Sequence, residues 1–280
     1  MKSATKLALA LGLAIAADAA GAKDWEKVTI ATEGAFAPWN LTNPDGSLGG
    51  YEVDLYADLC TRMKVECTLV AQNWDGMIPG LLAGKYDAIM SGMSATEERE
   101  KVIAFSQSYG STGQSFGVMK DGPLADLPHQ GELFSLVTNP DGAKATVAEL
   151  RPLLEGKVIG VQGSSIGARF IEENFGDIAE VREYKTTEQH DLDLQSGRID
   201  VVMASPAYLM TTIKDNPDAG MIMVGPRFQG GMLGRGSAVG LRKEDGELKE
   251  MFDKALSEAK ADGTTRKLAE KWFGFDVTVY

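Results

Sequence analysis

One short pattern occurs twice in the chain, and it constrains the fold more than any other feature of the sequence. Residues 82–90 read Leu-Ala-Gly-Lys-Tyr-Asp-Ala-Ile-Met, and residues 194–203 read Leu-Gln-Ser-Gly-Arg-Ile-Asp-Val-Val-Met. The two segments share a glycine, a basic residue, an aspartate and a methionine in the same order. Chance similarity between two βα units is the alternative. We interpret the repeat as the mark of two similarly built α/β lobes, which fits a chain of 280 residues because one domain takes about 150.

Strands alternate with helices around both copies of the repeat. The expected strands are residues 28–31, 67–70, 86–90 and 158–161, and the expected helices are residues 51–63, 74–83 and 166–174. This alternation predicts an α/β fold with parallel sheets covered on both faces. Residues 120–152, with four prolines and three glycines, are expected to form a surface excursion. Residues 247–272 are expected to be helical, with a break at Asp262 and Gly263.

If these C-terminal helices pack on the first lobe, the chain crosses between the lobes twice. We expect the first crossing near residues 111–113 and the second in the glycine-dense segment 230–236. The predicted first lobe is therefore residues 23–112 plus 232–280, and the predicted second lobe is residues 113–231. Two crossing strands form a hinge.

The N-terminus has the organisation of a secretory signal peptide. Lys2 and Lys6 precede the apolar run 7–17, and the small residues at 20–22 fit a cleavage site. We expect residues 1–22 to be removed and the protein to be exported to the periplasm. A membrane anchor is the alternative, but the apolar run is about half of the roughly 20 residues that span a bilayer.

Export affects the interpretation of the two cysteines, because disulfides persist outside the cytoplasm. Cys60 and Cys67 are seven residues apart, and we expect a disulfide that joins a helix end to the next strand. A metal site would need more ligands nearby, and His129 and His190 are both distant in sequence. The sequence therefore predicts no metal site and no cofactor.

The charge of the chain argues against one class of partner. Its 28 Lys and Arg against 40 Asp and Glu give a net charge of −12, which repels phosphate backbones and anionic lipid headgroups. We expect a monomer that does not bind nucleic acid.

Residues 163–167 read Gly-Ser-Ser-Ile-Gly and satisfy the Gly-x-Ser-x-Gly pattern of serine hydrolases, with Ser165 as the nucleophile. A triad in this order needs an acid and then a histidine. The only later histidine, His190, lies 25 residues on in a polar segment. The alternative is that hydroxyl and backbone N–H groups at a helix N-terminus bind a carboxylate, which needs no histidine. We interpret the motif as a binding element.

Small hydroxyl residues also follow the first copy of the repeat, in residues 91–94, and Arg99 lies about one helical turn beyond them. A guanidinium there can bind a carboxylate through two charge-assisted hydrogen bonds. The alternative is that Arg99 pairs with Glu97 or Glu100 on a solvated helix.

Three residues near turns have two possible roles each. The rings of Phe36 and Trp74 can flank a ligand, although such rings commonly pack in a core. Glu33 is either a solvated loop acid or the countercharge for a cationic ligand group.

The chain resembles the periplasmic substrate-binding proteins of polar amino acid ABC transporters, in particular the branch that binds lysine/arginine/ornithine, octopine and nopaline. The resemblance covers essentially the whole chain after the signal peptide. It rests on these segments: Ile-Ala-Thr-Glu-Gly-Ala-Phe-Ala-Pro-Trp-Asn at 30–40, Gly-Tyr-Glu-Val-Asp-Leu at 50–55, Trp-Asp-Gly-Met-Ile-Pro at 74–79, Lys-Tyr-Asp-Ala-Ile-Met at 85–90, Arg-Glu-Lys-Val-Ile-Ala-Phe-Ser at 99–106, Gly-Leu-Arg-Lys at 240–243, and the ending Asp-Gly-Thr through Lys-Trp-Phe-Gly at 262–274.

The resemblance implies a two-lobed type II periplasmic binding fold with two crossover hinge strands, and a ligand held between the lobes. It implies that Arg99 grips the ligand α-carboxylate and that Glu33 meets a distal cation. The residues that would help Arg99 are Ser91, Gly92 and Ser94. Phe36 and Trp74 would sandwich the ligand side chain. From the second lobe, Gln162, Ser164 and Ser165 would close over the ligand. Cys60 and Cys67 match the disulfide of the family.

One position departs from this family pattern. Binders of free amino acids carry an aspartate for the α-ammonium after the second copy of the repeat, and this chain has Ser205 there. Without that anion, the site should accept a substituted amine that carries a second acid group, because two like charges in a low-dielectric cleft repel each other. This interpretation predicts an opine such as octopine or nopaline.

The predicted function is therefore the binding component of an ABC importer, which delivers the opine to a membrane permease. A sugar-derived (mannityl) opine or a free basic amino acid such as arginine is the alternative ligand. The chain is expected not to be an enzyme, although a dehydratase or a serine hydrolase on the same fold is the alternative class. A receptor's ligand-sensing domain is the third, but it would normally be tethered to a membrane.

Overall fold

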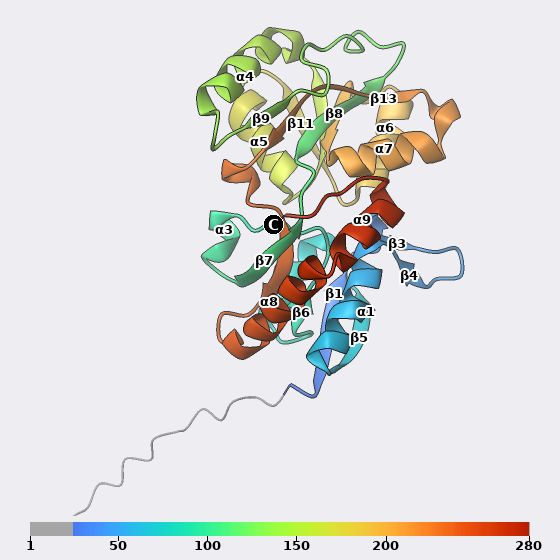
Figure 1. Cartoon of the computed structure of the whole chain (residues 1–280). Helices are drawn as coiled ribbons and strands as arrows, with labels where there is room; N and C mark the ends of the chain where they lie inside the picture. Colours follow the sequence, from blue (N-terminus) through green and yellow to red (C-terminus); the bar gives the residue numbers. More distant parts are fainter. Residues whose placement is uncertain (1–24, 280) are drawn as a thin grey trace, which may run out of the picture.

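The computed structural model describes residues 25–279 and shows two lobes, each built around its own sheet (Figure 1). The predicted signal peptide lies outside the described residues. None of the helices described is both long and apolar enough to cross a membrane.

The first sheet has the strand order β5-β1-β6-β14-β7. Its strands are β1 (Lys27–Thr32), β5 (Glu66–Ala71), β6 (Ala88–Ile89), β7 (Ala104–Gly110) and β14 (Ser237–Leu241). The helical elements of this lobe are α1 (Tyr51–Met63), η1 (Trp74–Gly76), α2 (Met77–Leu82), α3 (Glu97–Glu100), α8 (Gly246–Ala261) and α9 (Thr264–Phe273). A small sheet of β2 (Ala35–Phe36), β3 (Asn40–Thr42) and β4 (Leu48–Gly49) lies beside them.

The second sheet has the strand order β11-β10-β12-β8-β13-β9. Its strands are β8 (Gln114–Met119), β9 (Leu133–Ser135), β10 (Val158–Gln162), β11 (Glu180–Tyr184), β12 (Val201–Ala204) and β13 (Met221–Gln229). The helical elements of this lobe are α4 (Pro140–Leu154), α5 (Ile166–Phe175), α6 (Thr187–Gln195), α7 (Pro206–Asp215), η2 (Pro217–Ala219) and η3 (Gly231–Leu233).

Each sheet is covered on both faces. Successive side chains of a strand point to opposite sides, so that one strand contributes to two hydrophobic cores. In β1, Val28 and Ile30 belong to the core beneath α1 and α8, whereas Ala31 belongs to the core beneath α2. In β12, Val201 and Val202 are divided between two cores in the same way. The two-lobed α/β prediction is confirmed.

The two copies of the sequence repeat make the same contact in the two lobes. Asp87 accepts a hydrogen bond from the backbone N–H of Thr29 at 3.0 Å, and Asp200 accepts one from Val158 N–H at 2.8 Å. Each aspartate thus ties the strand at the end of the repeat to the first parallel strand of its lobe. This common role explains why the aspartate recurs.

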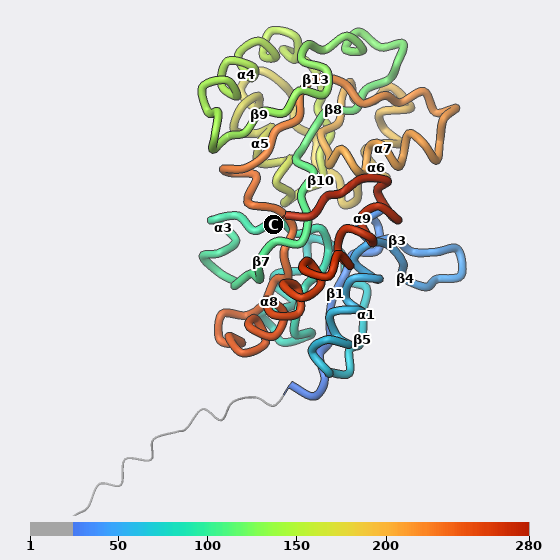
Figure 2. Tube along the Cα trace, viewed as in Figure 1, coloured from blue at the N-terminus to red at the C-terminus, as the bar shows by residue number. Residues whose placement is uncertain are grey.

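Residues 111–113 connect β7 to β8, and residues 230–236 connect β13 to β14, so both segments pass from one lobe to the other (Figure 2). The C-terminal segment packs against the first connection, where Ser111 N–H donates to the Val277 carbonyl at 2.8 Å. The boundaries 112/113 and 231/232 between the lobes stay a prediction.

Two expectations about secondary structure were wrong. The sheets are mixed, because β14 runs antiparallel to β6 and β7, and β8 runs antiparallel to β12 and β13. The segment 120–152 is not an irregular excursion, since it contains β9 and most of α4. Helix α4 begins after Asn139, whose side chain accepts from Gly142 N–H at 3.1 Å, and it buries Val147, Leu150 and Leu154 on one face. The prolines at its two ends obscured this spacing.

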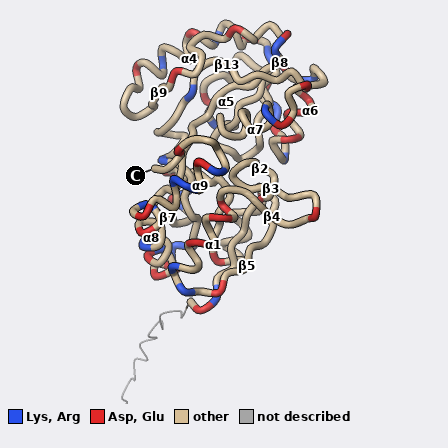
Figure 3. Tube along the Cα trace, turned by 45° about the vertical axis from the view of Figure 1, so that its right-hand side comes forward, with Lys and Arg blue, Asp and Glu red and all other residues tan. Residues whose placement is uncertain are grey.

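The predicted disulfide is confirmed: Cys60 near the end of α1 is joined to Cys67 in β5. Acidic and basic positions are interspersed over both lobes (Figure 3). Within residues 25–279, no group of three or more His, Cys, Asp or Glu side chains is arranged to hold a metal ion.

Candidate ligand-binding site

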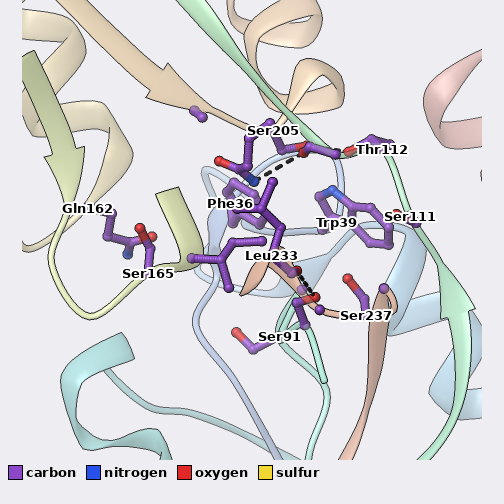
Figure 4. A pocket seen from close by; sticks show the side chains of 18 of the residues that line it. Phe36, Trp39, Ser91, Ser111, Thr112, Gln162, Ser165, Ser205, Leu233 and Ser237 are labelled. Atoms are coloured by element: carbon purple, nitrogen blue, oxygen red, sulfur yellow. Dashed lines mark hydrogen bonds between the residues drawn. The ribbon is translucent and has the colours of Figure 1, made fainter. Parts of the chain in front are cut away.

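A cavity lies between the two lobes and is lined by residues of both (Figure 4). Ten of the eleven predicted binding residues line it: Glu33, Phe36, Trp74, Ser91, Gly92, Ser94, Arg99, Gln162, Ser165 and Ser205. The sequence did not single out several further lining residues, among them Trp39, Ser111, Thr112, Gln114, Thr187 and Ser237. Among the lining residues of the described chain, only Glu33 and Arg99 carry charged side chains.

Arg99 lies on the short helix α3, which Thr96 caps by accepting from Arg99 N–H at 3.2 Å. Its guanidinium donates to the Ser94 carbonyl at 2.9 Å and to the Ser164 carbonyl at 3.1 Å, and it stacks 5.3 Å from the Trp74 ring. Burial lowers the pKa of Arg99 to about 10, so it remains a cation at neutral pH. These carbonyl and ring contacts, rather than Glu97 or Glu100, hold the side chain at the cavity.

Ser164 is the predicted binding residue that does not line the cavity. Its backbone has a φ of 58°, and its exposed side chain lies at an adjoining crevice beside Arg99. Its carbonyl is what faces the first lobe, as the acceptor for Arg99. Ser165 does line the cavity, and its hydroxyl accepts from Ala168 N–H at 3.0 Å as the N-cap of α5.

Glu33 follows β1 and is half-buried opposite β10. The Gln162 side chain donates to a Glu33 carboxylate oxygen at 2.7 Å and thus links the two lobes. Burial raises the pKa of Glu33 to about 7, the Gln162 hydrogen bond opposes this shift, and the nearby acids Asp75, Glu188 and Glu52 add to it. A cation placed against this carboxyl group would favour its ionised form and lower its pKa.

The aromatic residues contact partners within the protein. Phe36 stacks on Tyr208 of the second lobe, with ring centroids 5.6 Å apart and planes inclined by 16°. Gly92 leaves room for Phe36, because a Cβ atom at this position would lie 2.9 Å from the ring. One face of Phe36 is therefore covered by Tyr208, while Trp74 faces Arg99. That these two rings sandwich a ligand stays a prediction.

The buried carboxylate of Glu52 holds residues next to the cavity in place. Glu52 accepts hydrogen bonds from Gly92 N–H and the Asn40 side chain, each at 2.7 Å, and from the Tyr109 hydroxyl. Asn40 in turn accepts from Gly34 N–H at 2.7 Å. The Gly92 N–H is therefore used within the protein, and its predicted help to Arg99 would have to come through another group.

The hydroxyl groups of the lining residues Ser91, Ser94 and Ser205 also have partners within the protein. Ser91 accepts from Glu33 N–H at 2.9 Å, and Ser94 donates to the Leu233 carbonyl at 2.7 Å. Ser205 is the N-terminal neighbour of α7, and its Oγ lies 2.7 Å from Thr112 Oγ1 in the first crossover.

Comparison with known proteins identifies the family. The bacterial extracellular solute-binding proteins, family 3, match residues 28–275. The chain belongs to this family. The octopine-binding periplasmic protein of Rhizobium meliloti is 45% identical over 98% of each chain. The L-arginine-binding protein of Pseudomonas aeruginosa is 33% identical over 97% of this chain and 98% of its own.

The solved structures agree with this membership. A periplasmic His/Glu/Gln/Arg/opine family-binding protein from Silicibacter pomeroyi, in complex with lysine, has a TM-score of 0.73 at 33% identity and covers 90% of this chain and 100% of its own. The predicted family and fold are therefore confirmed, and the chain is a solute-binding protein of the ABC importer type.

Proposed function

We propose that the protein binds an opine of the octopine type, an imino-diacid with a guanidinium group, in the cavity between its lobes. The observation that carries the proposal is Ser205, a neutral hydroxyl paired at 2.7 Å with Thr112 where binders of free amino acids place an aspartate. A secondary amine with an acid substituent suits this neutral corner better than a primary ammonium does. The 45% identity to an octopine-binding relative supports it.

In this proposal, the two charged lining residues bind the two ends of the arginine-like part. Arg99 binds the α-carboxylate, because its planar guanidinium can donate two parallel hydrogen bonds to a carboxylate. Glu33 binds the guanidinium of the ligand. This cation favours the ionised form of a carboxyl group whose pKa is otherwise about 7. Gln162 and Ser165 contribute from the second lobe.

Free arginine is the second candidate ligand, and a mannityl opine is the third. Arginine is favoured by the same Glu33 and Arg99 pair and by the relative named an L-arginine-binding protein. A mannityl opine lacks the guanidinium that Glu33 would bind.

The proposal also covers the setting of the protein. A cleaved signal peptide would release it into the periplasm as a monomer, and it would deliver its ligand to an inner-membrane permease. No bond of the ligand is made or broken: the Ser165 hydroxyl is engaged as a helix cap, and His190 is buried between Tyr184 and Tyr208. Mass spectra of the ligand before and after incubation should be identical, and a new product would contradict this part.

Calorimetric titration with octopine, nopaline, mannopine and arginine tests the ligand assignment. Octopine or nopaline should bind most tightly. A wide margin in favour of arginine would show that the interpretation of Ser205 is wrong, and a mannityl opine as the tightest ligand would contradict the role of Glu33.

A further inference from the structure

Trp39 lines the cavity with a polar group that the roles above do not use. The residue lies just before β3, its side chain is 2% exposed, and its rings pack on Tyr51, Tyr109 and Phe273. Its indole Nε1–H has no hydrogen-bond partner among the described residues. Figure 4 shows this nitrogen on the ring edge turned toward the cavity. A buried donor without an acceptor is costly, so a bound molecule is the expected source of the acceptor.

The chemistry of this donor restricts what it can bind. An indole N–H donates and cannot accept, so it cannot receive a hydrogen bond from an ammonium group. The partner must therefore be an acceptor, such as a carboxylate oxygen of the ligand.

A second donor lies in the same part of the cavity. Thr112 Oγ1 and Ser205 Oγ are 2.7 Å apart, and the bond between them uses one of their two hydroxyl protons, which leaves the other available to a ligand. In Figure 4, Trp39 and Thr112 lie on the side of the cavity opposite Gln162 and Ser165. Glu33 and Arg99 are linked to that other side, through Gln162 and the Ser164 carbonyl.

We propose that Trp39 Nε1–H and the Thr112–Ser205 hydroxyl pair form a subsite for a carboxylate attached to the ligand's α-nitrogen. One carboxylate oxygen accepts from the indole and the other accepts from the free hydroxyl proton. The inference rests on the proposed function, because it assigns the second acid group of an opine. It adds Trp39 as a residue that distinguishes an opine from an amino acid whose nitrogen carries no acid.

NMR of the ¹⁵N-labelled full chain tests the subsite without any substitution. The chain has four tryptophans, so the assigned Trp39 indole N–H resonance can be followed on its own. Octopine should move this resonance strongly downfield. Nα-methylarginine, which has the alkylated nitrogen without the acid, should leave it nearly in place. Equal shifts with both ligands, or no shift with octopine, would overturn the subsite.

Substitution gives an independent measurement. Trp39→Phe should weaken octopine binding about tenfold, the loss expected for one hydrogen bond to a charged group, and should change Nα-methylarginine binding less than twofold. Trp272→Phe is the matched control, because its indole donates to Asp54 at 2.7 Å outside the cavity, and it should alter neither affinity. Equal loss for both ligands in Trp39→Phe would show a packing role only. If this variant does not fold, the NMR result decides.

These experiments distinguish failure of the proposed function from failure of the subsite alone. Wild-type protein that binds arginine but not octopine would contradict the proposed function and the subsite with it. Wild-type protein that binds octopine, with full octopine affinity in Trp39→Phe and an unshifted indole resonance, would contradict the subsite alone.

Discussion

At the scale of single residues, Arg99 and Glu33 are the two charged side chains that line the cavity in the described part of the chain. Arg99 is held by two backbone carbonyls and the Trp74 ring, whereas Glu33 is held by one hydrogen bond from Gln162. Within the first lobe, the Ser94 carbonyl and the Trp74 ring hold the guanidinium, whereas the bonds from Gln162 to Glu33 and from Arg99 to the Ser164 carbonyl join the two lobes.

Arg99→Lys should weaken the binding of every carboxylate ligand by about 1–3 kcal/mol, because an ammonium cannot reproduce the paired hydrogen bonds of the planar guanidinium. Calorimetry with octopine and arginine measures the loss. Arg151→Lys, on the exposed pair with Asp177 within the second lobe, is the matched control and should change neither affinity. Unchanged binding in Arg99→Lys would remove Arg99 from the site.

The affinity for a guanidinium ligand should increase with pH. Burial raises the pKa of Glu33 to about 7 in the absence of a ligand cation, and a bound guanidinium favours the ionised form and lowers that pKa. Binding below neutral pH therefore releases a proton, so affinity should rise up to about tenfold per pH unit below this pKa and level off above it. Glu33→Gln should bind more weakly, with a flat pH profile. A flat profile in the wild type would contradict the role of Glu33.

The sequence could not reveal every residue of the site. The sequence does not single out Trp39, because a tryptophan in a turn-rich segment has no periodicity that separates a cavity residue from a core residue. The motif at Ser164 indicates a helix N-terminus but not the positive φ that turns its side chain away from the cavity, and its role in binding stays a prediction. Arg99 and Glu33 are singled out by their residue type and position, which leave their roles open, whereas Gln162 comes only from the family resemblance.

At the scale of elements, a helix with uninterrupted hydrophobic spacing could be predicted from the sequence. A helix that contains prolines, and the relative direction of strands from distant parts of the chain, could not. Helix α1 has the predicted bounds 51–63, because Leu55 and Leu59 recur on its buried face. Helix α4 has an equally regular buried face, but Pro140 and Pro152 lie within it and resemble loop signals. The antiparallel strands were missed because neighbours such as β6 and β14 come from distant parts of the chain, and no local pattern specifies their direction.

Replacing both cysteines, Cys60→Ala with Cys67→Ala, should lower the free energy of unfolding by about 2–3 kcal/mol, since the disulfide closes a short loop in the unfolded chain. Chemical denaturation measures this change. Ligand affinity should be unaffected, because neither cysteine lines the cavity. An unchanged midpoint, or a large loss of affinity, would contradict a purely structural role.

At the scale of the whole molecule, the two lobes are joined by contacts that cross the cleft. Gln162 donates to Glu33, Arg99 donates to the Ser164 carbonyl, and Thr187 donates to the Ala35 carbonyl at 3.2 Å. A ligand that bridges Arg99 and Gln162 adds to these contacts only when the lobes are together. It therefore shifts the population toward the closed form.

Small-angle X-ray scattering should accordingly show a smaller radius of gyration when octopine is added to the wild type. Arg99→Ala, at the same octopine concentration, should show little change. A radius of gyration that does not respond in the wild type, under conditions where calorimetry shows saturation, would contradict closure on the ligand.

The proposed preference for an opine depends on the neutral residue at position 205, and one calorimetric experiment tests it most directly. The affinities of octopine and arginine are measured for the wild type and for Ser205→Asp. The wild type should prefer octopine, and the restored carboxylate should reverse the order by repelling the second acid group and attracting the primary ammonium. A wild type that prefers arginine, or an affinity ratio that the substitution leaves unchanged, would contradict the account.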